Sequence, residues 1–130
     1  MKMLVCGSRD VDEQEVLAAL CKLTLELSNH IVDLHDMEII LGGARGVDKI
    51  AEKWFRDAGV PIKVFTANWE EYGRRAGILR NIKMLNHLGD SGMVVAIHNG
   101  DSPGTAFVIK EAKSRNLQLK ILKVRYTKTI

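Results

Sequence analysis

The chain has 130 residues, of which 46% are hydrophobic and 27% charged, and it carries a net charge of +3. These values describe a soluble globular protein with one domain of ordinary size, residues 1–130, and leave no length for a second domain. No apolar run approaches the roughly 20 residues of a membrane span. The apolar start ends at residue 6, too early for a secretory signal, so we expect a cytoplasmic protein without membrane contact.

Charge is unevenly divided along the chain. Residues 1–61 carry 7 basic and 11 acidic side chains, whereas residues 62–130 carry 12 basic and 5 acidic ones. The two halves therefore have net charges of −4 and +7. The second half favours an anionic partner, either a nucleic-acid strand or a phosphorylated metabolite.

Two cysteines lie far apart in apolar stretches. Cys6 and Cys21 belong to no CxxC pattern. We expect both to be reduced thiols in the core rather than a disulfide or a metal pair.

Five short apolar runs alternate with four helical patterns. In chain order the predicted elements are strand 2–6, helix 12–28, strand 37–41, helix 47–58, strand 62–66, helix 75–88, strand 92–97, helix 103–115 and strand 118–124. This alternation is typical of a parallel sheet with crossover helices. The second and fourth strands are almost continuously apolar, which favours interior strands covered on both faces. The predicted fold class is α/β: a single Rossmann-like doubly wound domain, with about five mostly parallel strands and helices on both faces.

The helix predicted over residues 47–58 has the clearest amphipathic pattern. Apolar residues from Val47 to Ala58 recur on one face, which places Trp54 in the core. Gly59 and Pro61 then end the helix.

Glycine and turn residues follow three of the predicted strands. They form the segments GSRD at 7–10, GGARGVD at 42–48 and HNGDSPGT at 98–105. Doubly wound sheets bind ligands outside the carboxyl ends of their strands, and glycine there lets a ligand approach the backbone closely. Strand-to-helix turns also use glycine without any ligand. Because GxGxxG does not follow the first strand and GxxxxGK[ST] is absent, an ordinary dinucleotide dehydrogenase and a P-loop NTPase are both disfavoured.

The segment SPGTA at 102–106 predicts a helix start. Ser102 is suited to the N-cap and Pro103 to the first helical position. The backbone N–H groups of Gly104, Thr105 and Ala106 then lack helical partners. Unpaired donors at a helix start attract anions, so we expect a phosphate-sized group here.

Three arginines gather in residues 68–85. Arg74 and Arg75 are predicted near the start of the helix over 75–88, where cations are unfavourable unless an anion compensates them. Arg80 and Met84 share one helix face, with Asn81 beside them. A solvated basic helix is the alternative interpretation.

Several single residues have both a functional and a structural interpretation. Arg9 could form a bidentate contact with phosphate or ribose, or pair with a neighbouring aspartate. Asp48 could accept a ribose hydroxyl, although stabilising the helix start is the simpler role. Trp69 and Tyr72 could stack on a base or cover the sheet edge. His98 could contact a ligand, but a structural histidine is favoured, and because the histidines are scattered we expect no metal and no cofactor.

The motifs together resemble a known family. They are Gly7-Ser8-Arg9, Gly42-Gly43-Ala44-Arg45-Gly46-Val47-Asp48, Trp69, Gly73-Arg74, Ala76-Gly77, Arg80-Asn81, Met84 and Gly104-Thr105. In this order, over nearly the whole chain, they look like the YspA-like branch of the SLOG superfamily. The resemblance implies a Rossmann-like domain that binds nucleotides or nucleotide-derived ligands, including ADP-ribose-type molecules, at this edge. It also implies a ligand sensor, as some relatives are in bacterial or phage conflict systems.

The resemblance extends to the Lonely Guy phosphoribohydrolases, which cleave a base from a ribose phosphate. Arg80 in RNIKM matches the arginine of their R-K-x-x-M helix. Their glutamate, which follows the P-G-G-x-G-T loop, is absent because the GT pair here is followed by Ala106. Hydrolysis of an N-glycosidic bond needs a carboxylate, so Asp48, Asp90 or Asp101 would have to be brought in by the fold.

We therefore expect a module that binds a nucleotide or nucleotide-derived phosphorylated ligand, as a sensor or a sequestering protein. The residues expected to bind it are Gly7, Ser8, Arg9, Gly42, Gly43, Arg45, Gly46, Asp48, Trp69, Arg74, Arg80, Asn81, Ser102, Gly104 and Thr105. The alternatives are an N-glycosidic hydrolase with Arg80 as a catalytic residue, and single-stranded nucleic-acid binding, which the related fold of the DNA-processing protein A implies. Glu70 and Glu71 lie between the two candidate stacking aromatics and argue against nucleic acid.

We also expect a homo-oligomer, a dimer or a tetramer. The family resemblance implies self-association. In addition, the helix predicted over 75–88 carries more apolar residues than one buried stripe uses, and a large exposed apolar patch is normally covered.

Overall fold

The structure, a computed structural model, describes residues 1–30 and 33–125. Its sheet has five strands, all parallel, in the order β3-β2-β1-β4-β5. The strands are β1 (Lys2–Gly7), β2 (Glu38–Leu41), β3 (Ile62–Val64), β4 (Met93–His98) and β5 (Gln118–Lys123). All five predicted strands are present, although β3 ends two residues earlier than predicted. The predicted fold class, a single Rossmann-like α/β domain, is confirmed.

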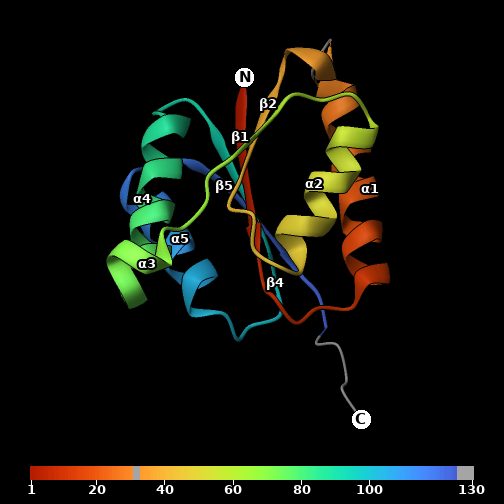
Figure 1. The fold of residues 1–130 in the computed structure, drawn as a ribbon. Coiled ribbons are helices and arrows are strands. Elements are labelled where there is room, and N and C mark those ends of the chain that lie inside the picture. The colour runs from red at the N-terminus through yellow and green to blue at the C-terminus, as the bar shows by residue number, and fades with distance from the viewer. Residues whose placement is uncertain (31–32, 126–130) are drawn as a thin grey trace.

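Helices cover both faces of the sheet (Figure 1). On one face lie α1 (Glu13–His30) and α2 (Val47–Asp57), and on the other lie α4 (Ala76–Leu88) and α5 (Pro103–Ser114). The helix α3 (Trp69–Tyr72) and the 3-10 helices η1 (Leu34–Asp36) and η2 (Gly73–Arg75) are short additions. The two helices of one face precede the two helices of the other in the sequence. The acidic first half of the chain therefore contains α1 and α2, and the basic second half contains α4 and α5.

The core divides into two layers according to the alternation of side chains along the strands. Met3 and Val5 of β1 pack into the layer beneath α1 and α2. Leu4 and Cys6 point the opposite way, into the layer beneath α4 and α5. Both layers exist because successive side chains of a strand face opposite sides, and each apolar face needs its own helices.

Two residues expected in the core are less buried than predicted. Trp54 is only partly buried, because its Nε1–H donates to Thr24 Oγ1 at 3.0 Å on the surface of α1, and Phe55 is the buried aromatic residue of α2. A buried indole N–H needs such a partner, which holds the ring near the edge of the layer. Cys21 is exposed on α1, whereas Cys6 is buried as expected.

The segment before α4 also differs from the prediction. Arg74 and Arg75 lie in η2 instead of in the first turn of α4. The short helix α3 was not predicted: Asn68 begins it, its Oδ1 accepting the Glu71 backbone N–H at 3.1 Å. Arg75 is nevertheless the N-cap residue of α4, so both arginines directly precede that helix.

The order of the strands determines where a crevice forms. From β1 the chain adds β2 and β3 on one side, and then β4 and β5 on the other. The connections that leave β1 and β4 at their carboxyl ends therefore diverge to opposite faces, which is the usual location of a ligand site in this fold. Among the described residues, no helix has both the length and the apolar character needed to cross a bilayer.

Candidate functional site

Loops after three neighbouring strands, β2, β1 and β4, meet at the carboxyl edge of the sheet. Ser8 and Asn99 connect two of these loops. Ser8 Oγ donates to Asn99 Oδ1 and accepts the Asn99 backbone N–H, both at 3.0 Å. Asn99 Nδ2 also donates to the Asp10 carbonyl oxygen at 2.8 Å. Ser8 is 1% exposed, so these bonds fix the loops from beneath.

Gly46 attaches the third loop. Its φ is +78°, and a Cβ at this position would lie 2.4 Å from the carbonyl oxygens of Ser8 and Arg9. The next residue, Val47, donates its backbone N–H to the Ser8 carbonyl oxygen at 3.1 Å. Only glycine permits both the conformation and this close approach. Gly46 and Ser8, both predicted as ligand residues, line neither of the cavities described below, so the structure places them as supports.

Two adjoining cavities open above these loops, with volumes of about 460 and 430 Å³. The predicted residues that line the first are Gly7, Arg9, Asp48, Trp69, Arg74, Arg80, Asn81, Ser102, Gly104 and Thr105. Three further predicted residues, Gly42, Gly43 and Arg45, line the second cavity alone. Arg9, Trp69 and Arg80 line both cavities, so the two form one continuous cleft.

The start of α5 opens into the first cavity. Ser102 is the N-cap residue, but its side chain makes no capping hydrogen bond and instead lies 2.9 Å from Thr105 Oγ1. The Ala106 backbone N–H donates to the Ser102 carbonyl oxygen at 2.9 Å, so the prediction that it is unpaired was wrong. The amides of Gly104 and Thr105 lie in the first turn, where no carbonyl of the helix can reach them.

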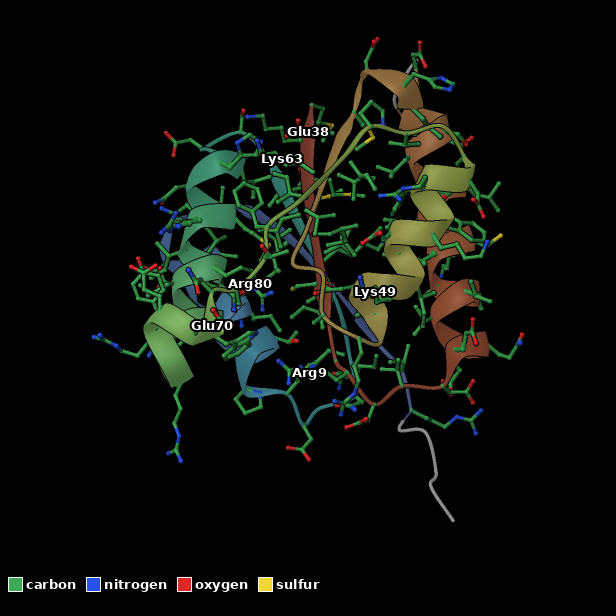
Figure 2. All side chains as sticks on the ribbon, viewed as in Figure 1. Arg9, Glu38, Lys49, Lys63, Glu70 and Arg80 are labelled. Atoms are coloured by element: carbon green, nitrogen blue, oxygen red, sulfur yellow. The ribbon has the colours of Figure 1, made fainter. Side chains whose placement is uncertain are left out.

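Arg80 crosses from α4 to the loop after β2. Its Nη1 donates to the Gly42 carbonyl oxygen at 2.5 Å and its Nε donates to Asn81 Oδ1 at 2.9 Å. The Nδ2 end of Asn81 is then left beside α5, 3.9 Å from the position of a Cβ on Gly104. Burial lowers the pKa of Arg80, and the nearby carboxylate of Asp48 opposes this shift. Figure 2 shows Arg80 and Arg9 between the two helix layers, toward the carboxyl ends of the strands.

Asp48 is the buried carboxylate of the site, 6% exposed, at the second position of α2. Its Oδ2 accepts the Ala44 backbone N–H at 3.1 Å, while Oδ1 has no hydrogen-bond partner within the described part of the chain. Burial raises the pKa of Asp48 to about 6, against the opposing effects of the Ala44 N–H and Arg80. An exposed acidic side chain would favour a helix start equally well, so that role does not require the burial of Asp48.

Trp69 forms an apolar wall of both cavities. The tip of its ring lies 3.3 Å from the position of a Cβ on Gly77, so glycine there lets the indole lie against α4. The ring remains 51% exposed, and Ile78, 47% exposed, lies beside the same cavity. Tyr72, the second candidate for stacking, lines neither cavity.

Other predictions for single side chains have mixed outcomes. Arg45 pairs with Asp10 at 3.1 Å, so this aspartate is engaged away from Arg9. His98 lines neither cavity, and its Nδ1 is buried without a partner among the described residues, contrary to the expectation of a satisfied structural histidine. Asp48 and Asp101 line the first cavity together with Arg80, whereas Asp90 does not. Residues 1–30 and 33–125 contain no cluster of three side chains that could hold a metal ion.

Asn99 also shapes the site, although it was not among the predicted ligand residues. Asn99 organises the loop after β4, and its Oδ1 also accepts the Asp101 backbone N–H at 2.9 Å, an Asx turn. The available signal was an asparagine two positions before an aspartate in NGD, directly after a predicted strand. Gly77, which belongs to the motif that resembles the family, makes room for Trp69 in a contact between α3 and α4.

Comparisons with known proteins identify the family of the chain. The sequence profile of the YAcAr family, described as YspA, cpYpsA-related SLOG, matches residues 1–72. The Gene 61 protein of Mycobacterium phage D29 is 34% identical over 88 residues, which cover 64% of this chain and 69% of that protein. No solved structure matches the chain significantly. The matched residues include β1, β2 and both glycine-rich loops that follow them, and the chain therefore belongs to the YspA, cpYpsA-related SLOG family.

Proposed function

We propose that the protein binds a nucleotide or nucleotide-derived phosphorylated ligand, such as a nucleoside phosphate, NAD or ADP-ribose, and acts as a cytoplasmic sensor or sequestering module. One observation carries the proposal. Hydrogen-bond donors from the start of α5 and from α4 converge on a cavity of about 460 Å³ that arginines also line. This volume lies within the usual range of small-molecule sites, roughly 300–1,000 Å³.

The donors suit a phosphate group. The Gly104 and Thr105 amides have no acceptor within α5, and the positive end of the helix dipole adds to their attraction for an anion. Asn81 Nδ2 lies near the same backbone. Arg9, Arg74 and Arg80 line this cavity as well and supply compensating charge.

The rest of the cavity suits a base and a sugar. The exposed ring of Trp69 offers a flat apolar surface at one wall. Membership of a SLOG family is consistent with binding of nucleotide-related molecules. A ligand that joins a phosphate to a planar base uses both regions at once.

Gly104→Asp tests the phosphate region with little risk to the fold. A Cβ at Gly104 would meet only Asn81 Nδ2, at 3.9 Å, and an acidic residue in the first turn favours the helix. The new carboxylate would, however, occupy and repel the phosphate. We expect the parent protein to gain thermal stability with at least one of AMP, ADP, NAD, ADP-ribose or a cyclic adenine nucleotide, by about 2.7 kcal/mol at a hundred times Kd, and Gly104→Asp to lose that gain.

Arg80→Ala and Lys63→Ala form a matched pair, since each removes one positive charge. Arg80 lines both cavities. Lys63 lines neither and lies toward the amino ends of the strands, away from the cleft (Figure 2). We expect Arg80→Ala to abolish the ligand-induced shift and Lys63→Ala to retain it. If both Arg80→Ala and Gly104→Asp respond like the parent, the site is elsewhere.

Hydrolysis of an N-glycosidic bond is a second candidate function, favoured by the position of Asp48. The fold brings this carboxylate into the same cavity as Arg80. Asp48 would then take the role of the glutamate that is absent after Gly104-Thr105. In such a reaction water displaces the base from C1′ of the ribose, directed by a carboxylate. Incubation with nucleoside monophosphates, NAD and ADP-ribose, followed by chromatography, tests it: free base must appear, and no release at high protein concentration excludes the reaction for these substrates.

A further inference from the structure

The cavity proposed above contains one feature that a phosphate cannot explain. Its cationic and amide groups donate hydrogen bonds, yet Asp48 lies among its lining residues as a nearly buried acceptor. A carboxylate has capacity for about four hydrogen bonds. Asp48 receives one from the Ala44 N–H, and its Oδ1 receives none within the described residues.

Leaving such an oxygen unpaired is costly in a buried position. A buried acceptor without a partner loses its hydration and receives nothing in return. Arg80 does not relieve this loss directly, because its Nη1 and Nε bond to Gly42 and Asn81 instead of to Asp48. The carboxylate is thus held at the cavity wall with its hydrogen-bonding capacity unfilled.

The charge of Asp48 limits which part of a ligand can face it. A phosphate beside a buried carboxylate would be repelled, so the phosphate belongs at the start of α5. The group opposite Asp48 must not be an anion and must donate hydrogen bonds. The hydroxyls of a ribose meet both conditions and are joined to a phosphate in the ligand class proposed above.

We propose that the Asp48 carboxylate accepts hydrogen bonds from the ribose hydroxyls of the ligand, so that the site selects ribonucleotides over deoxyribonucleotides. This inference rests on the proposed function. Asp48 lines the cavity with Oδ1 just beneath its surface, so a small shift of the side chain accompanies the contact, and the sugar hydroxyls fill the hydrogen-bonding capacity of this oxygen. The Ala44 N–H then holds the other oxygen.

The test compares AMP with 2′-deoxyAMP and 3′-deoxyAMP by isothermal calorimetry. Hydrogen bonds to a charged group are worth enough for at least about a tenfold loss of affinity when the hydroxyl that contacts Asp48 is missing. In Asp48→Asn we expect AMP to bind at least about tenfold more weakly and its advantage over the deoxynucleotides to shrink. Glu52→Gln is the matched control: it lies one turn further along α2, lines neither cavity, and should keep the parent's preference.

The outcomes separate this inference from the function on which it rests. If AMP and both deoxynucleotides bind the parent equally, ribose selection by Asp48 is wrong while phosphate binding stands. Ribose selection by Asp48 is also wrong if Asp48→Asn, shown to be folded by circular dichroism, retains the full preference. If AMP, ADP, NAD, ADP-ribose and the cyclic adenine nucleotide all fail to bind the parent, both proposals are overturned.

Discussion

At the scale of single residues, the buried carboxylate of Asp48 lowers the stability of the fold while it lines the candidate site. Burial disfavours its charged form, and the Ala44 N–H, Arg80 and Arg9 only partly offset this effect, while Glu52 adds to it. The pKa rises from its ordinary value of 3.8 to about 6. A protein selected for stability alone would place an uncharged residue here.

The raised pKa predicts a specific dependence of stability on pH. Between about pH 4 and 6 the folded protein keeps the Asp48 proton while the unfolded chain releases it, so stability falls as the pH rises through this window. The full effect is about 3 kcal/mol. Asp48→Asn cannot ionise, so its free energy of unfolding relative to the parent should increase from pH 4 to 7.5 by up to this amount. Urea unfolding at both pH values measures it, and an unchanged difference contradicts the raised pKa.

At the scale of elements, the site depends on loops that are joined to one another before any ligand arrives. Ser8 after β1 and Asn99 after β4 form two hydrogen bonds across the crevice, and Gly46 packs its backbone against Ser8. Preorganised donors lose less entropy on binding than mobile ones. The hydrogen bonds between Ser8 and Asn99, called the crosslink below, should therefore increase ligand affinity by holding these loops in place.

Replacing Ser8 tests this crosslink. Ser8→Ala removes two hydrogen bonds of a buried hydroxyl to the half-buried Asn99, each worth about 0.5–1.5 kcal/mol, so we expect a loss of about 1–3 kcal/mol in the free energy of unfolding. Ser28→Ala is the control, because Ser28 is exposed on α1, where its hydroxyl donates to the Leu25 carbonyl oxygen; it should change stability by less than about 0.5 kcal/mol. Urea unfolding compares the two. Equal stabilities of the variants would show that the bonds across the crevice contribute nothing.

At the scale of the whole molecule, the apolar surface around α3 and α4 bears on self-association. Met84, Leu85 and Leu88 of α4 are buried, as a core-facing stripe should be. Ile78 in the first turn of α4 and Trp69 on α3 are about half exposed. Exposed apolar groups that lie close together are commonly covered by a ligand or by another chain.

The predicted homo-oligomer gives a test at this scale. Ile78→Lys and Leu25→Lys each place a charge at an exposed aliphatic position, on α4 and α1 respectively. If α4 forms the interface of a dimer or tetramer, light scattering after size exclusion should show that Ile78→Lys lowers the molecular mass to that of a monomer and that Leu25→Lys does not. A monomeric parent protein would contradict the expected oligomer.

Local sequence determined the elements and the edge at which their loops gather. Apolar runs in β1, β2 and β4 and the amphipathic pattern of α2 identify a parallel α/β sheet, because burial on both faces and helical periodicity leave marks within a few residues. Glycine-rich segments after three strands pointed to the carboxyl edge for the same reason. The first-turn amides at Gly104 and Thr105 were also predictable, since Ser102-Pro103 is itself a local signal.

Only the tertiary structure decided which of these side chains face one cavity and which support it. Ser8 and Gly46, predicted as ligand residues, line neither cavity and hold the loops together, while Asn99 gained its role from Ser8, which is 91 residues away in sequence. The unfilled oxygen of Asp48 could not be foreseen, because burial and hydrogen-bond partners depend on packing between α2, α4 and the loop after β2. Periodicity is encoded within single segments, whereas burial of a polar atom is a property of several segments brought together.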